Sequence, residues 1–235
     1  MACLLCRLIC DRLIPAEKGR HAFWQYSREW ETVFARDWEP WHPSDEVWDR
    51  AEILATILKS DPAAGIHELA ALAELNSAWA AHQLGRYYEH GYVVDRDIKL
   101  AKDYYEKAVH AGSWMGSRDL AGLIFKHLIG DEWEAILKDG DAAGFVPSTF
   151  WLAWYSYKRS PTRSTARELR PLFEKASQAG HPGARRILTG WKFTGKFGLR
   201  EIRQGLREAG QAYVEFVDRE FPQREPPRLE LDEAA

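Results

Sequence analysis

Apolar residues recur at helical spacing along most of this chain, and the amphipathic stretches end at glycine or other turn residues. In the stretch 77–112, Ala81, Leu84 and Tyr88 share one helical face, and Gly91 follows. A second apolar face lies beyond that glycine, on Ile98, Ala101, Tyr104, Tyr105 and Ala108. Glycine favours helix ends because it adopts the left-handed conformation at little cost. The pattern therefore predicts two antiparallel helices joined by a short loop.

The residue that ends such a pair recurs along the chain. It stands at Asn76, Gly112, Gly144 and Gly180, with intervals of 36, 32 and 36 residues. Apolar positions follow the same offsets, so that the equivalents of Leu84 are Leu120, Leu152 and Leu188. Periods in this range indicate stacked supersecondary units. We expect an all-α chain built from four or five helix pairs.

One unit matches a known repeat pattern over its whole length. Its spacing is Leu84-Gly85-x-x-Tyr88-x-x-Gly91-x-x-Val94-x-x-Asp97-x-x-x-Ala101-x-x-Tyr104-Tyr105-x-x-Ala108-x-x-x-Gly112. This stretch resembles the Sel-one-like repeat (SLR) family, a branch of the tetratricopeptide-like helical repeats, although Val93 and Val109 replace a common Gly and Ala. The resemblance implies a right-handed α-solenoid of antiparallel helix pairs with helical caps, which binds other proteins and has no chemistry of its own.

The repeats are expected to occupy the middle of the chain. We expect an aromatic-rich N-terminal cap (1–43), repeats over 44–198 (about 44–76, 77–112, 113–144, 145–180 and 181–198 onward), a C-terminal capping helix (199–221) and a disordered tail (222–235).

The N-terminal segment is unusually aromatic. Of the 11 tryptophans, five lie between Trp24 and Trp48. The spacing of Phe23, Trp30 and Phe34 predicts an amphipathic helix. These rings either cap the first end of the solenoid or form a binding site, since Trp and Tyr dominate interface hot spots. A cap that also forms one wall of a groove satisfies both interpretations.

Cys3, Cys6 and Cys10 would lie on one side of a helix. We favour small apolar residues in the core or facing a partner. The alternatives are a lipid attachment point and a metal or redox site, because thiolates bind zinc. No paired CxxC motif supports the metal site. Three cysteines make no disulfide framework, so a reducing cytoplasm is the expected compartment.

Composition excludes several function classes. The net charge is −3 and the charges are mixed, whereas nucleic-acid binding usually requires a basic face. No run of 18 apolar residues occurs, so no membrane span is expected. No nucleophile elbow or complete zinc-protease motif is present, and we assign no catalytic residue and no cofactor.

The resemblance also implies where a partner binds, because first helices of each pair line the concave face in that family. The implied side chains of the clearest repeat are Trp79, Gln83, Arg86, Tyr87 and His90. Translated by the repeat offsets, Tyr87 aligns with Leu123, Tyr155 and Trp191, and Trp151, Trp154 and Lys158 lie beside that column. Aromatic anchors beside Arg and Lys suit a partner with an acidic, partly apolar segment. The alternative is that the column packs between neighbouring repeats.

We therefore expect a non-enzymatic module that binds another protein, such as a toxin or a signalling protein. A bacterial adaptor, or an immunity protein that neutralises a cognate toxin, suits a chain devoted to one binding surface. The alternatives are the metal or redox protein described above and a structural subunit that docks on a larger complex through the segment from Trp24 to Trp48.

Overall fold

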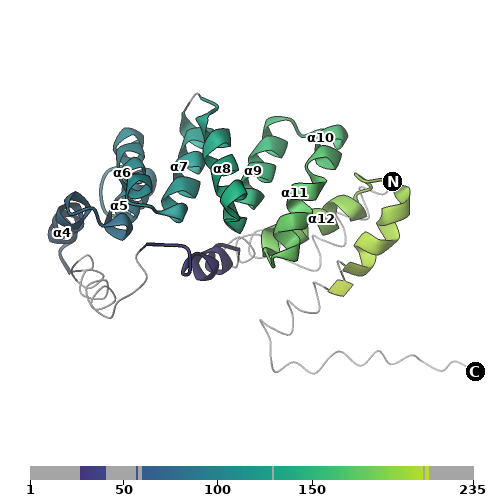
Figure 1. Ribbon diagram of the computed structural model, residues 1–235, viewed down its shortest axis with the longest axis horizontal. Helices are drawn as coiled ribbons and strands as arrows, with labels where there is room; N and C mark the ends of the chain where they lie inside the picture. Colours follow the sequence, from purple (N-terminus) through teal and green to yellow (C-terminus); the bar gives the residue numbers. More distant parts are fainter. Residues whose placement is uncertain (1–26, 41–56, 58–59, 129, 209, 212–235) are drawn as a thin grey trace, which may run out of the picture. The chain divides into compact units, whose positions relative to one another are not determined.

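The computed structural model describes residues 27–40, 57, 60–128, 130–208, 210 and 211. All regular elements within these ranges are helical. The chain divides into two compact units, Met1–Arg185 and Arg186–Ala235. In the first unit, successive helices pack against one another in antiparallel pairs (Figure 1). The prediction of an all-α solenoid is confirmed.

The helices follow one another in the order expected for stacked pairs. They are α4 (Pro62–Glu74), α5 (Ala78–His90), α6 (Ile98–His110), α7 (Trp114–His127), α8 (Glu132–Ala143), α9 (Val146–Arg159), α10 (Arg163–Glu168), α11 (Arg170–Gln178) and α12 (Pro182–Phe193). Contacts join each of α4 to α8 to the next helix, and α9 packs against α11.

Local sequence explains where the helices begin. Ser77, Asp97 and Ser113 are the N-caps of α5, α6 and α7. Each side-chain oxygen accepts a hydrogen bond from the backbone N–H three residues later, at 3.3, 2.9 and 2.8 Å respectively. Such caps satisfy amide groups that have no partner within the helix.

The repeat period corresponds to a recurring helix end. Asn76, Gly112, Gly144 and Gly180 have φ angles of 63, 90, 92 and 92°. At each one, the N–H of the following residue donates to a carbonyl five residues earlier in the chain, at 2.8 to 3.0 Å. This is the Schellman arrangement, in which a left-handed residue closes the last turn of a helix. The spacing seen in the sequence is thus the spacing of one backbone turn.

The core lies between the helix layers. One cluster joins α6, α7, α8 and α9 through side chains that include Tyr105, Leu123, Trp133, Leu137 and Tyr155. A second cluster, centred on Leu69 and Leu84, joins α4, α5 and α6.

One expected helix is divided. The sequence predicts a single helix from Thr165 to Ala179, whereas α10 ends at Glu168 and α11 begins at Arg170. Pro171 explains the break, because proline has no N–H to donate to the carbonyl of Arg167 and its ring crowds that carbonyl.

The second unit contains most of α12 and the start of the predicted C-terminal capping helix. A 3-10 turn at Leu199–Glu201 precedes helical residues 202–208, and Gly198 before it has a φ of 120°. Lys192 on α12 pairs with Glu208 at 2.7 Å. The predicted tail (222–235) lies outside the described residues. Among the residues that are described, no helix has the length and apolar character needed to cross a membrane.

Candidate functional site

Residues 27–40, called the N-terminal segment below, pack against the solenoid through one largely aromatic face. Residues 27–35 are helical. Trp30, Phe34 and Trp38 follow one another along this face, with ring centres 5.0 and 6.2 Å apart. The predicted aromatic stripe is therefore present on a helix over its described part.

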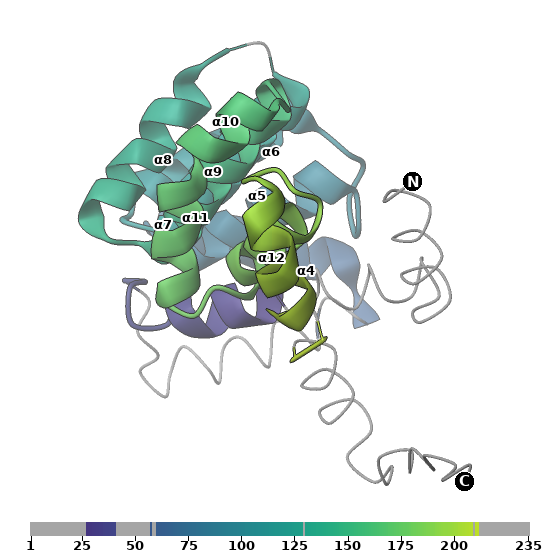
Figure 2. The ribbon, with the colours of Figure 1, turned by 90° about the vertical axis from the view of Figure 1, so that its right-hand side faces the viewer.

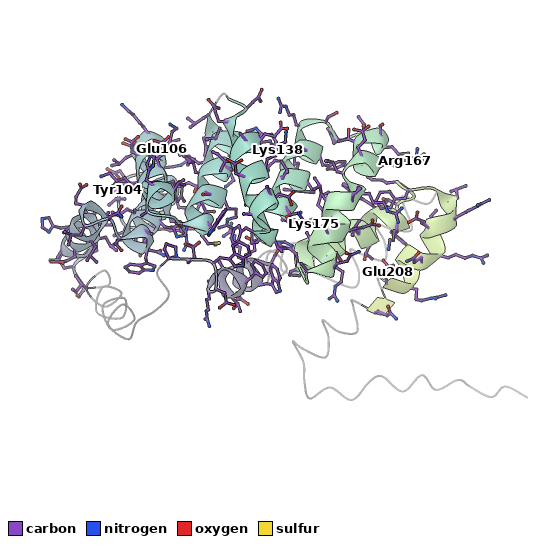
Figure 3. The ribbon with its side chains drawn as sticks, viewed as in Figure 1. Tyr104, Glu106, Lys138, Arg167, Lys175 and Glu208 are labelled. Atoms are coloured by element: carbon purple, nitrogen blue, oxygen red, sulfur yellow. The ribbon has the colours of Figure 1, made fainter. Side chains whose placement is uncertain are left out.

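This segment packs on the turns that join successive repeats. Trp30 lies beside Gly180, Trp38 beside Gly144, and Pro40 beside Gly112. The segment thus runs opposite to the order of the repeats. Figures 1 and 2 show it (purple) along the ends of the helices, and side chains fill the space between them (Figure 3).

The described part of the segment does not cover the first end of the solenoid, which is where the sequence placed the cap. It lies along the turns of the later repeats. Trp38 packs at 5.8 Å from Trp114 and at 5.6 Å from Phe145, measured between ring centres. The cap predicted over 1–43 stays a prediction, because residues 1–26 and 41–43 lie outside the described ranges.

Glu31 is the polar anchor of the segment, and its side chain is buried. It forms an ion pair with Arg118 of α7. Trp151 of α9 donates its indole N–H to Oε1 at 3.1 Å, and His181 Nε2 lies 3.0 Å from the same oxygen. Three side chains from three successive repeats therefore converge on one carboxylate.

The ion pair continues into the solenoid. Arg118 also contacts Asp119 at 2.5 Å, and Asp119 contacts His82 Nε2 at 2.8 Å. Burial opposes the charge of Asp119, but Arg118 and the hydrogen bond from His82 outweigh it and lower the pKa of Asp119. Burial lowers the pKa of His82. The chain from Glu31 to His82 is thus a buried network of charged and polar groups.

A surface hollow of about 290 Å³ opens beside this anchor, and we call it the hollow. Two walls form it, one from the N-terminal segment and one from α9. Its lining residues are Ser27, Arg28, Glu31, Trp151, Trp154 and Lys158. Lys158 Nζ lies 4.9 Å from the centre of the Trp154 ring, in a cation–π arrangement. Trp151 and Trp154 are half-buried, whereas Arg28 and Lys158 are exposed.

The structure brings three of the side chains singled out in the sequence together in the hollow, namely Trp151, Trp154 and Lys158. Leu123 and Tyr155 are buried in the core instead. The Tyr155 ring stacks on Phe125 with centres 4.2 Å apart. Leu123 and Tyr155 therefore pack between neighbouring repeats, which was the alternative given in the sequence analysis, and they are not part of a partner-binding surface.

The remaining predicted residues do not line the hollow. Trp79, Gln83 and Tyr87 on α5 are half-buried, and Arg86 and His90 are exposed. Trp191 lies in the second unit, where it is buried and packs at 5.9 Å from Phe197.

The weak metal candidates Cys3, Cys6 and Cys10 lie outside the described residues. Within the described ranges, no group of three or more His, Cys, Asp or Glu side chains could hold a metal ion.

Sequence reasoning missed four residues of the site: Arg28, Glu31, Arg118 and His181. The signal for Glu31 was present, because an acidic residue between Trp30 and Phe34 falls on the aromatic face of the helix. Nothing in the sequence indicated its partners, because they stand 87, 120 and 150 residues away.

Comparisons with known proteins identify the architecture. No family model and no curated protein matches the chain. Among solved structures, the chain is similar to a Sel1 repeat protein from Oxalobacter formigenes, with a TM-score of 0.52 and 17% sequence identity. The similarity covers 69% of this chain and 64% of that protein. Together with the recurring helix pairs, this similarity shows that the chain has a Sel1-like repeat helical fold.

Proposed function

We propose that this protein is a non-enzymatic protein-binding module and that the hollow receives a side chain of the partner. The observation that carries the proposal is the pair of half-buried indoles, Trp151 and Trp154, beside the exposed cation of Lys158. Large aromatic side chains in partly desolvated recesses are the usual anchors of protein interfaces. Stacked repeats also supply a continuous surface on which a partner can lie.

The charges at the hollow indicate the chemistry of the partner. Arg28 and Lys158 stand on opposite walls and are exposed. Glu31 also lines the hollow, but its carboxylate is already bound by three donors. The charge available to a partner is therefore positive, and it complements an acidic segment that also carries apolar side chains.

The wider binding surface extends to the exposed and half-buried side chains of α5. Trp79, Gln83, Arg86, Tyr87 and His90 have the same combination of aromatic, polar and cationic groups. An adaptor, or an immunity protein that covers a toxin, would use such a surface as a rigid unit. Both roles place an acidic partner in the hollow, so one experiment examines them together.

The test compares the wild-type protein with Trp154→Ala, Lys158→Glu and a control, Lys138→Glu. Lys138 lies on α8 (labelled in Figure 3) and is exposed. Each variant is used to capture partners from native lysate after treatment with a carbodiimide, which joins lysine amines to carboxylates. We expect a peptide that links Lys158 to an acidic residue of the partner, and roughly tenfold weaker retention by the two hollow variants.

Equal retention by all four proteins would show that the hollow is not the binding site. If wild-type protein retained no partner under any growth condition, the proposed function itself would be wrong. Circular dichroism of each variant confirms that any loss of binding occurs in folded protein.

A further inference from the structure

The N-terminal segment is both a ligand of the solenoid and half of the hollow. Ser27, Arg28 and Glu31 supply one wall of that recess. Glu31 also holds Trp151, a residue of the opposite wall, through the indole N–H. The hollow is therefore complete only while the segment is docked.

The groups around Glu31 have the features of a receptor for a carboxylate. Arg118 supplies a guanidinium, Trp151 an indole N–H and His181 an imidazole nitrogen, and the three come from different repeats. His181 is fully buried and held in place by ring stacking on Phe150, with centres 4.1 Å apart. Its Nδ1 accepts a hydrogen bond from the N–H of Ala184 at 3.3 Å, so that Nε2 is the nitrogen that carries the proton toward Glu31.

Packing alone does not require this arrangement. The other side chains on the docked face, such as Trp30, Phe34 and Trp38, bury apolar surface against the turns. A buried carboxylate costs free energy unless donors surround it. Those donors make docking depend on the Glu31 carboxylate in addition to the apolar contacts, and removal of this side chain leaves Arg118 and His181 without it.

We propose that Arg118, Trp151 and His181 form a carboxylate-binding site that Glu31 occupies from within the same chain, and that occupation of this site assembles the hollow. The second part rests on the proposed function, because it makes partner binding conditional on docking of the N-terminal segment. The first part stands independently of any partner. The ligand class is a carboxylate on an aromatic-flanked helix.

Chemical rescue tests the first part in the full-length chain. Glu31→Ala removes a fragment equivalent to acetate, so added acetate can refill the site. Amide hydrogen exchange of residues 27–35 reports docking. We expect exchange in Glu31→Ala to be faster by about a hundredfold, as for a broken buried ion pair. Acetate should restore protection, whereas acetamide and an equal concentration of chloride should not.

Two matched variants support the measurement. Asp37→Ala removes an exposed carboxylate of the same segment, six residues away, and should leave exchange unchanged. Glu31→Gln keeps the shape of the side chain without its charge and should give an intermediate rate, which keeps the test valid if the alanine variant folds poorly. Unchanged protection in both Glu31 variants would overturn the site. Equal rescue by acetate and acetamide would show that the recess is not selective for a carboxylate.

The link to the hollow has its own readout. Retention of the captured partner by Glu31→Ala should fall and then recover with acetate. If retention stays at the wild-type level while the exchange data show an undocked segment, the carboxylate site stands and its control of the hollow is wrong. If no protein captures a partner, only the proposed function fails, because the exchange experiment needs none.

Discussion

The ring of Tyr105 lies directly against the backbone of Gly85, and a Cβ at Gly85 would stand 2.5 Å from Tyr105 Cδ1. Tyr105 is fully buried, so it has little space into which to move. The two helices of this repeat, α5 and α6, therefore approach closely only because position 85 carries no side chain.

Gly85→Ala should destabilise the protein by about 1–3 kcal/mol, because the added methyl group forces a close contact in a packed core. Urea unfolding followed by circular dichroism measures the change. Gly190→Ala is the control, since a Cβ at that position of α12 meets no atom within 4 Å. It should be neutral or stabilise by up to about 1 kcal/mol through helix propensity. Equal destabilisation by both variants would contradict the close-contact explanation.

Tyr105 also holds a buried acid. Its hydroxyl donates to Glu89 at 2.8 Å, and burial raises the pKa of Tyr105, so the hydroxyl keeps its proton. Tyr105→Phe should cost about 1–2 kcal/mol, because Glu89 then loses a donor and keeps Lys126 at 3.2 Å. Tyr92→Phe, at an exposed position, should change the unfolding midpoint very little. A Tyr105→Phe protein as stable as the wild type would indicate that water or Lys126 replaces the lost bond.

Stability should depend on pH through Glu39. This side chain is buried and accepts a hydrogen bond from the N–H of Met115 at 2.5 Å. Burial raises its pKa from 4.5 to about 7, so the folded state binds a proton that the unfolded state has lost. Its contribution to stability is therefore greatest below the unfolded pKa and decreases as pH rises through the window from 4.5 to about 7.

Glu39→Gln isolates this effect, because the amide oxygen can still accept from Met115. Between about pH 5 and about pH 8, the wild type should lose about 2 kcal/mol relative to the variant. His82 changes stability in the opposite direction. Burial lowers its pKa, so its contribution to stability is lost as the pH falls below 6.5. Subtraction of the two curves removes that contribution. Parallel curves would show that Glu39 is ionised in the folded state throughout.

Arg118→Met should be the most destabilising of these substitutions, at about 3–5 kcal/mol, because it leaves Glu31 and Asp119 without their buried cation. Arg159→Met breaks surface ion pairs with Asp131 and Glu134 and should cost below about 1 kcal/mol. Combination of Arg118→Met with Glu31→Gln should cost less than the sum of the single changes. Strict additivity in the double-mutant cycle would argue against coupling between these two side chains.

Much of the fold follows from local sequence. The left-handed residues at Asn76, Gly112, Gly144 and Gly180 were predictable because a helix end of this kind depends on the residue itself. N-caps such as Ser77 and Ser113 are local in the same way. The break between α10 and α11 also has a local cause, Pro171. It was not predicted, because apolar residues continue at helical spacing on both sides of the break.

The hollow was predictable only in part. Trp151, Trp154 and Lys158 were placed together because residues three and four positions apart share one face of a helix. The repeat offsets selected Leu123 and Tyr155, which are buried, since periodicity alone does not separate the face toward a neighbouring repeat from the face toward solvent. The wall formed by Arg28 and Glu31 depends on contacts across more than half the chain, which no local pattern encodes.

The contacts of Trp30, Trp38 and Pro40 with three successive turns also limit how this array can change in length. In most solenoids each unit touches only its neighbours, so a unit can be added or removed without changing the contacts of distant units. Here an additional unit between Gly112 and Gly180 would shift those turns out of register with three side chains that lie within 11 consecutive residues, Trp30 to Pro40. Growth is compatible with docking only ahead of Gly112 or beyond Gly180. The N-terminal segment therefore fixes the number of repeats between Gly112 and Gly180.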